Sequence, residues 1–455
     1  MLVAPLGIAW FAAVALVLLD GRRALVGWLA VGALAATLGA TVALAVEVLQ
    51  NGAVRSVAGG WPAGVGITLR ADALGVIFAV VSTSVLLAAL AYEVIGGVES
   101  STFPALVLFM ATGLTGVFLT GDAFNFYVFF EIAMIAAYVL TGYGQETRQI
   151  RAAAIFTVVN LLGSVLFLIG IASLYHVTGR LDMLGIALRS DDVETQPIIL
   201  IAVIIFVAFG VKLGLFPFHF WLPAVYTSTR PSVAAILSGA LANIGSYGLL
   251  RFGADVLPRE LEQGGPALLL LGSVSIVYGA LQALSRSAAS EVLAYSTIGQ
   301  VGYILIALGV GGRIGYAAAI LFAVVNALNK TLLFLSVELR GRLVWLAFVV
   351  GAFSVAGLPP AVGFFGKAAL FRAGIAERSA VLIALIFVGG ALSFVYMFQT
   401  EQRRFWTGDA DEPSPLARRG LVLVLAGLVV ALGIWPEPLL ALSERAAAVL
   451  PERRP

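Results

Sequence analysis

The sequence predicts an all-α polytopic membrane protein with about 14 transmembrane helices. Of its 455 residues, 61% are hydrophobic and only 11% are charged, whereas an average soluble chain is about 25% charged. The apolar residues gather in runs of about 20, which is the length that spans a bilayer, and the mean hydropathy is +1.03. We therefore expect a single membrane domain over residues 1–455.

The expected spans are separated by short turns or by loops that hold most of the charged residues. In order they are Leu2–Leu19, Ala24–Leu49, Ala73–Tyr92, Phe103–Thr120, Ala123–Thr141, Ala152–Val177, an interrupted segment Ile198–Val233, Val233–Phe252, Ala267–Leu284, Val292–Val310, Ile314–Val337, an interrupted segment Leu343–Phe371, Val381–Gln399 and Gly420–Trp435. The arginine pairs at 22–23, 403–404 and 418–419 then share one side, which the positive-inside tendency makes cytoplasmic.

Several classes of function are excluded by residue content. The chain has no cysteine, so disulfides, thiolate metal sites and iron–sulfur clusters are not expected. A formal net charge of +2 gives no reason to expect a nucleic-acid partner. No phosphate loop, nucleophile elbow or histidine cluster is present, so we predict no cofactor, no metal site and no enzymatic activity of the chain itself.

Two of the expected spans are interrupted by proline and carry a lysine. Lys212 lies before Pro217 and Pro223, and Lys367 follows the break at 357–360. A broken helix is tolerated in a membrane inside protein or beside a water-filled cavity. Paired interrupted segments predict two inverted repeats, here residues 103–252 (spans 4–8) and 267–400 (spans 9–13). The alternative is two unrelated kinked helices, because proline is common in membrane helices.

The lysines are the most informative charged residues. Of 27 basic residues only Lys212, Lys330 and Lys367 are lysines, and all three lie within apolar segments. Arginine stays protonated, while a buried lysine can release its proton. A general replacement of lysine by arginine explains the 24 arginines but not the intramembrane position of the remaining lysines. We therefore expect these lysines to carry protons.

Glu131 is the one acid that lies clearly inside a span, in the segment NFYVFFEIAMIAAYVL. A carboxylate at that depth must be paired, protonated or hydrated. Lys212 is its expected partner, and breaking such a pair would free a proton. The alternative is a static ion pair that fixes two helices.

Other polar residues could extend the path. Asn326 shares a helical face with Lys330 at four residues' separation, although it could instead join helices by hydrogen bonds. His219 follows the first break, where a relay needs a group that titrates near neutral pH, but a lone histidine can also be structural. Gln300 belongs to a polar face of the tenth span that either lines water or only packs.

Several motifs, spread over most of the chain in a fixed order, carry a family resemblance. They are GGWPAGVGITLRAD at 59–72, GDAFNFYVFFE at 121–131, FPFHFWLPAVYTSTRPSVAAILSG at 216–239, LAYSTIGQVGYI at 293–304, the Lys330 segment and GLPPAVGFFGK at 357–367. The chain resembles the antiporter-like subunits shared by respiratory complex I, membrane-bound hydrogenases and Mrp cation/proton antiporters. Among these it is most similar to the Mrp D subunit.

The resemblance implies 14 helices with two five-helix inverted repeats, and a location in a prokaryotic cytoplasmic (inner) membrane beside other membrane subunits. It implies that Glu131 and Lys212 are the pair of a first half-channel. It also implies that Lys330 belongs to a central polar axis, that Lys367 ends the second half-channel, and that His219 is the motif's histidine after the first break.

The sequence departs from the family pattern at the middle of this axis. Asn243 stands where the family usually has a lysine that passes the proton between the two halves. Gln300 and Asn326 replace histidines that are often seen. An amide can hydrogen-bond water but cannot hold a transferable proton, so either water bridges the middle or this subunit is a divergent or impaired pump.

The expected function is that of the proton-translocating subunit of a multisubunit Na⁺/proton antiporter. One alternative keeps the fold in a redox-driven complex or an inorganic-carbon uptake complex. Another is a structural membrane subunit that conducts nothing, which Asn243 motivates. A stand-alone transporter of a small organic solute is the least favoured, because the sequence carries no signal of a substrate pocket.

Overall fold

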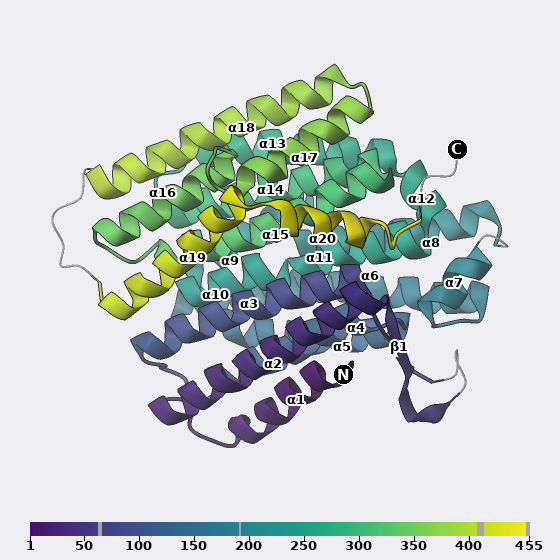
Figure 1. The fold of residues 1–455 in the computed structure, drawn as a ribbon, viewed down its shortest axis with the longest axis horizontal. Helices are drawn as coiled ribbons and strands as arrows, with labels where there is room; N and C mark the ends of the chain where they lie inside the picture. The colour runs from purple at the N-terminus through teal and green to yellow at the C-terminus, as the bar shows by residue number, and fades with distance from the viewer. Residues whose placement is uncertain (62–65, 191–192, 407–413, 452–455) are drawn as a thin grey trace.

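Long helices lying side by side form most of the molecule (Figure 1). The computed structural model describes residues 1–61, 66–190, 193–406 and 414–451. Its α-helices are α1 (Ala4–Val17), α2 (Ala24–Asn51), α3 (Ala73–Gly96), α4 (Phe103–Leu119), α5 (Ala123–Thr141), α6 (Thr147–Thr178), α7 (Met183–Ser190), α8 (Thr195–Leu213), α9 (Trp221–Ser228), α10 (Pro231–Ile236), α11 (Asn243–Gly248), α12 (Pro258–Gln263), α13 (Gly265–Leu284), α14 (Ala289–Val310), α15 (Gly312–Ser336), α16 (Arg342–Ala356), α17 (Gly363–Ala376), α18 (Ala380–Glu401), α19 (Leu416–Ile434) and α20 (Glu437–Ala447).

The predicted spans are confirmed. Within the described residues, eleven helices are long and apolar enough to cross a membrane, and three shorter apolar helices, α1, α4 and α16, take three further predicted positions. Together they account for the fourteen expected spans. The loop before α3 also holds a short hairpin that the sequence did not predict, in which β1 (Val54–Val57) pairs antiparallel with β2 (Thr68–Ala71).

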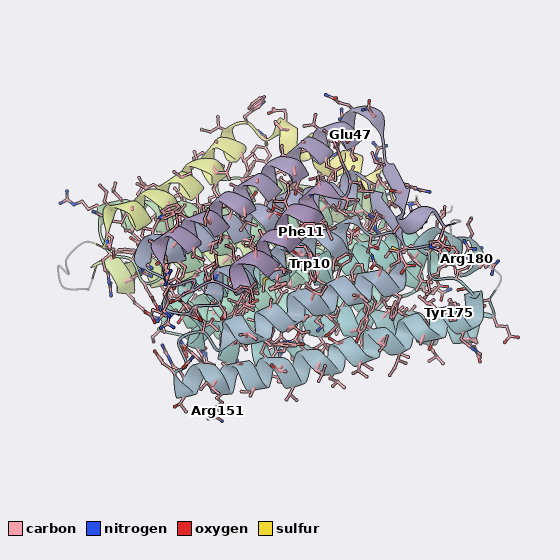
Figure 2. The ribbon with its side chains drawn as sticks, turned by 90° about the horizontal axis from the view of Figure 1, so that it is seen from below. Trp10, Phe11, Glu47, Arg151, Tyr175 and Arg180 are labelled. Carbon is pink, nitrogen blue, oxygen red and sulfur yellow. The ribbon has the colours of Figure 1, made fainter. Side chains whose placement is uncertain are left out.

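The outer helices present apolar side chains to their surroundings. On α1, Trp10 is 40% and Phe11 is 74% exposed, and Figure 2 shows both on the outside of the bundle. In the same view α6 runs from Arg151 at one end of the bundle to Tyr175 near the other. A helix of 32 residues is about 48 Å long, more than the hydrocarbon core of a bilayer. The outer surface is therefore suited to lipid.

Three spans form the interior of the bundle. The segment Pro231–Val256 and helix α14 are each 94% buried over their most apolar stretch, and α15 is 100% buried. They nevertheless carry Asn243, Gln300 and Lys330. Buried polar groups must find partners inside the protein, so these spans are where a polar path has to lie.

Both expected helix breaks are present, and each begins at a glycine in the left-handed region. Helix α8 ends at Gly214 with φ +64°, and α16 ends at Gly357 with φ +83°. Only glycine adopts this conformation at little cost. At Gly357 a Cβ atom would also lie 2.4 Å from Cδ of Lys367. The second break therefore leaves the space in which the lysine stem packs.

The eighth span is less regular than the sequence predicts. Two π-helical segments, η3 (Leu237–Leu241) and η4 (Leu249–Val256), flank α11. Such segments are rare and are frequent at functional sites. Asn243 lies at the start of α11, separated by one residue from the end of the first of them.

Candidate proton path

Lys212 is held by an outer helix through neutral groups. It lies in the last turn of α8 with 8% of its surface exposed. Its Nζ donates to the carbonyl of Asn160 at 2.7 Å and to Oγ of Ser164 at 3.1 Å, both on α6. It also lies 4.4 Å from the ring centre of Phe130. An ammonium near the carbonyl end of its own helix is favoured by the helix dipole.

The expected direct ion pair between Glu131 and Lys212 is not formed. Both residues are described, and no carboxylate oxygen of Glu131 lies within 4.0 Å of the Lys212 Nζ. Glu131 is half-buried on α5, and its Oε1 is buried without a hydrogen-bond partner. The two charges still interact electrostatically across a longer distance. Helix α6 packs against both α5 and α8, so its acceptors reach the ammonium first.

Lys330 is the most deeply buried of the three lysines, with none of its surface exposed. Its Nζ donates to the carbonyl of Leu293 at 3.0 Å and to Oγ of Ser296 at 2.9 Å, both on α14. The arrangement resembles that at Lys212, because one backbone carbonyl and one serine hydroxyl from a neighbouring helix receive the ammonium. Both amines thus contact acceptors that bear no charge.

A hydroxyl chain continues from Lys330 toward α18. The Tyr396 hydroxyl lies 3.1 Å from Oγ of Ser296 and 3.1 Å from Oγ of Ser393. Gln300 lies near the Tyr396 hydroxyl and interacts with it electrostatically. All of these side chains are buried. Hydroxyl groups both donate and accept, so this chain can pass a proton along the interior.

Lys367 contacts the C-terminal end of the second broken helix. Its Nζ donates to the carbonyl of Ala356, the last residue of α16, at 2.8 Å. It lies 5.5 Å from the ring centre of Tyr303, and 5% of its surface is exposed. The free carbonyls at a helix C-terminus carry partial negative charge, so the break supplies the acceptor that the buried ammonium needs.

Asn243 lies on α11, which packs against α8 and α15, the helices that carry Lys212 and Lys330. Its Nδ2 donates to Oγ of Ser82 and to the carbonyl of Gly239, both at 3.0 Å. A small cavity of about 10 Å³ lies beside Lys212 and extends to Ala242 and Ile244. That is the lower limit for one water molecule. Asn243 forms no hydrogen bond with Lys212 or Lys330 in the described part of the chain.

His219 and Asn326 lie apart from the lysine contacts. The His219 ring is 4.4 Å from the ring centre of Tyr278 on α13 and stacks against Phe216, and its Nδ1 is buried without a partner. Oδ1 of Asn326 is likewise buried and unpartnered. Neither residue forms a hydrogen bond with Lys212, Lys330 or Lys367, although each has an unused buried acceptor.

Sequence reasoning missed most of the polar groups that contact the lysines or that continue their hydrogen-bonded chains. Asn160 and Ser164 are four residues apart on α6, and Ser393 and Tyr396 are three apart on α18. Polar pairs at helical spacing within apolar spans were the available signal. Which groups each pair would contact depends on how distant helices pack, and the sequence does not specify that.

A buried charge network at one end of α3 was also missed. Arg251 on η4 pairs with Asp72 at 2.8 Å and with Asp255 at 2.8 Å, and Arg70 pairs with the same two acids at 2.9 Å each. Asp72 additionally caps α3 by accepting from the backbone N–H of Gly75. Nε of Arg251 donates to the Tyr247 hydroxyl. The network ties β2, α3 and the eighth span together.

A second network lies at the other end of α3. Glu93 is 2% exposed, and its carboxylate accepts from the Tyr143 hydroxyl at 2.9 Å and from Oγ of Ser232 at 2.7 Å. Arg230 lies 3.6 Å from Glu93 and also pairs with Glu99. Helix α3 is thus fixed at both ends, which holds Ser82 in place beside Asn243.

Residues 120–393 match the protein family described as NADH:quinone oxidoreductase/Mrp antiporter, transmembrane region. The chain belongs to this family. The matched region of this antiporter-family chain contains Glu131 and all three lysines, and it extends to Ser393.

Individual relatives are similar to this chain along nearly its full length. The family member is 31% identical to a protein named as the D subunit of a Na(+)/H(+) antiporter from Alkalihalophilus pseudofirmus, over 94% of this chain and 91% of that one. Its fold is similar to a chain in the Mrp complex from Dietzia sp., with a TM-score of 0.89 and 25% identity over 99% of this chain and 96% of that one. It is also similar to a chain of the archaeal membrane-bound sulfane sulfur reductase, with a TM-score of 0.91 and 25% identity over 98% and 97%.

Proposed function

We propose that this protein is the proton-translocating subunit of a multisubunit Na⁺/proton antiporter in a prokaryotic cytoplasmic membrane. It works beside other membrane subunits, and the coupled ion is Na⁺ or another monovalent cation. The name of the relative from Alkalihalophilus pseudofirmus supports the choice of complex. The arrangement of the buried lysines supports the choice of transported ion.

One observation carries the proposal most directly. Within the described part of the chain, none of the three buried lysines forms an ion pair, and each donates to a backbone carbonyl. A buried ammonium without a counter-ion is costly. Its proton therefore leaves readily when the local charge changes, which is the property a proton carrier needs.

In this proposal the proton moves along a chain of named groups. Glu131 changes the field at Lys212, and its own protonation decides whether the Lys212 ammonium is favoured. Water crosses the interval at Asn243, and the proton then reaches Lys330. Tyr396 and Gln300 lead from there to Lys367. His219 and Asn326, each with an unpartnered buried atom, hold water at the sides of this path.

We also propose that residues 103–252 and 267–400 are the two inverted repeats. Each contains a helix that ends at a left-handed glycine, Gly214 or Gly357. Each contains a lysine next to that break, Lys212 or Lys367. The two half-channels would then each have a lysine at the carbonyl end of a broken helix.

Replacing Lys212 tests the function. Lys212→Met keeps the length of the side chain and removes the charge. Proton-coupled Na⁺ transport by the whole complex in inverted vesicles is expected to be lost, while the complex still assembles on a native gel. Leu200→Ala, which changes an exposed residue of the same helix, is the control. Transport by the methionine variant at the control rate would refute the proposal.

A second candidate is a proton-pumping subunit of a redox-driven complex. The similarity in fold to a chain of the sulfane sulfur reductase favours it. Purification of the native complex separates the two candidates. Iron–sulfur proteins among the co-purifying subunits would select the redox-driven complex, whereas only further membrane subunits would select the antiporter.

A further inference from the structure

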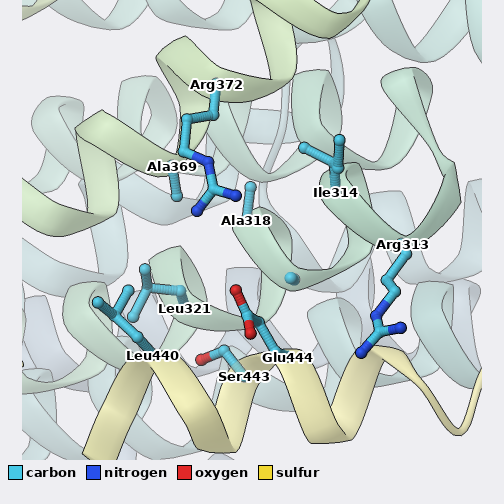
Figure 3. A pocket seen from close by; sticks show the side chains of 10 residues that line it. Arg313, Ile314, Ala318, Leu321, Ala369, Arg372, Leu440, Ser443 and Glu444 are labelled. Carbon is cyan, nitrogen blue, oxygen red and sulfur yellow. The ribbon is translucent and has the colours of Figure 1, made fainter. Parts of the chain in front are cut away.

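A pocket of about 250 Å³ lies between α15, α17 and α20, away from the lysine contacts (Figure 3). Helix α20 follows the last span and packs along α15 and α3. The pocket is lined by Arg313, Ile314, Ala317, Ala318, Leu321, Ala369, Arg372, Leu440, Ser443 and Glu444. Three separate segments of the chain thus meet around one space.

The rim of the pocket is charged. Figure 3 shows the guanidinium of Arg372 and the carboxylate of Glu444 pointing into the pocket from opposite walls, with Arg313 at its side. Within the described residues none of these three side chains has a hydrogen bond or an ion pair. The chain therefore presents two cationic groups and one anionic group with no partners of their own.

The interior of the pocket is apolar. Arg313 lies at the beginning of α15, and Leu321 lies eight residues further along, about 12 Å deeper into the bundle. Ala318, Ala369 and Leu440 add further apolar surface to the lining. The pocket therefore passes from charged groups near the helix ends to hydrocarbon side chains further along α15.

We propose that this pocket binds a phospholipid whose headgroup carries a primary amine. Arg313 and Arg372 bind the phosphate, because guanidinium groups donate paired hydrogen bonds to phosphate oxygens. Glu444 accepts hydrogen bonds from the lipid ammonium. The first part of an acyl chain lies against Leu321 and Leu440. The bound lipid joins α15 and α17, which carry Lys330 and Lys367, to α20.

The hydrogen-bond donors of the headgroup distinguish this lipid from other phosphate compounds. An anionic headgroup without an amine can balance the net charge of the two arginines and Glu444, but it offers Glu444 only hydroxyl donors, which form weaker hydrogen bonds than an ammonium does. A quaternary ammonium offers no N–H donor to the carboxylate. Free phosphate satisfies the arginines but leaves the apolar floor uncovered. A zwitterionic lipid with a primary ammonium group matches both the charged rim and the apolar lining of the pocket.

Lipid binding to the purified full-length chain tests the proposal without any transport assay. Native mass spectrometry in detergent measures binding of phosphatidylethanolamine, phosphatidylcholine and phosphatidylglycerol, and thermal shift measures the effect of inorganic phosphate. We expect phosphatidylethanolamine to bind about tenfold more tightly than the other two lipids, as loss of one charged hydrogen bond predicts. Inorganic phosphate should not raise the melting temperature.

Variants identify the site. Arg313→Gln/Arg372→Gln should weaken phosphatidylethanolamine binding at least about tenfold. Glu444→Gln should remove the preference over phosphatidylglycerol. The matched controls are Arg55→Gln and Glu437→Gln, which change exposed residues outside the pocket and should bind as the wild type does. Equal binding of all three lipids, stabilisation by phosphate alone, or unchanged binding by the arginine double variant would each overturn the proposal.

Discussion

The hydroxyl of Tyr396 lies 3.1 Å from Oγ of Ser296, the same oxygen that accepts a hydrogen bond from Lys330 at 2.9 Å. A tyrosine on α18 is thereby linked to a lysine on α15 through one serine. In the proposed path this is the step by which a proton leaves the central lysine. The contact gives the most direct test of the second half of the path.

Tyr396→Phe removes only the hydroxyl. We expect proton-coupled transport to fall at least about tenfold, because a positioned proton donor contributes more than this to proton transfer. The free energy of unfolding should fall by only about 1 kcal/mol, the value of a typical hydrogen bond. Vesicle transport and thermal melting of the same preparations separate the two effects. Tyr175→Phe, at an exposed position on α6, should leave transport unchanged.

Asn243→Lys tests whether water bridges the middle of the path. Oγ of Ser82 and the carbonyl of Gly239 already accept from Asn243, so the same acceptors can receive an ammonium. We expect faster transport, because a titratable group replaces a water-bridged step. Asn243→Leu should slow transport, since an apolar side chain excludes water from the site. Identical rates in both variants, with assembly intact, would favour a non-conducting subunit.

Arg251→Leu tests the buried charge network. It leaves Asp72 and Asp255 facing only Arg70, so one carboxylate charge remains uncompensated. Removing one partner of a buried ion pair typically costs about 3–5 kcal/mol, and we expect a clear fall in melting temperature. The double variant Arg251→Leu/Asp72→Asn returns the network to equal charge and keeps the helix cap. It should melt above the single variant; a melting temperature no higher would mean that charge balance is not the cause.

The turn before α5 provides a pH-dependent test outside the spans. Burial raises the pKa of the Asp122 carboxyl above its ordinary value, and the nearby Asp182 carboxylate adds to this. Because the folded-state pKa is raised, the protonated carboxyl stabilises the fold at acidic pH. This contribution is lost as pH rises through the raised value. Asp122→Asn keeps a capping oxygen, so it should raise the melting temperature at neutral pH and change nothing below the ordinary carboxyl range.

Asp20→Asn is the control for that experiment. The pKa of the exposed Asp20 carboxyl is lowered, mainly by a backbone hydrogen bond from Arg22. Its charged form is therefore the stabilising one, and the substitution should bring no gain at neutral pH. A gain of equal size in both variants would mean that reduced overall charge, not the burial of Asp122, is responsible.

The fold and the depth of the lysines followed from the sequence, because both depend on local composition. An apolar run of about 20 residues must span, and a lysine inside it must find acceptors in the protein. The identity of those acceptors did not follow. Glu131 was the expected partner of Lys212 because it is the one acid that lies clearly inside an expected span, but α6 lies against both helices and supplies Asn160 and Ser164 instead.

The irregular eighth span could not be predicted either. A π-helical segment differs from an α-helix by a small change in hydrogen bonding, and nothing in LSGALANIGSYGLL specifies it. In contrast, the glycines at 214 and 357 precede prolines closely enough that the sequence alone placed both breaks.

The near-complete burial of α14, α15 and the eighth span has a consequence for how this protein can vary. The outer helices separate the proposed proton path from lipid. Their side chains therefore need only form a continuous apolar layer. Most exchanges among leucine, valine, isoleucine and phenylalanine on the outer helices should leave transport unchanged in a saturation-mutagenesis screen. Even small changes within the three buried spans should be selected against. The positions that tolerate no substitution would then mark the residues of the proposed path.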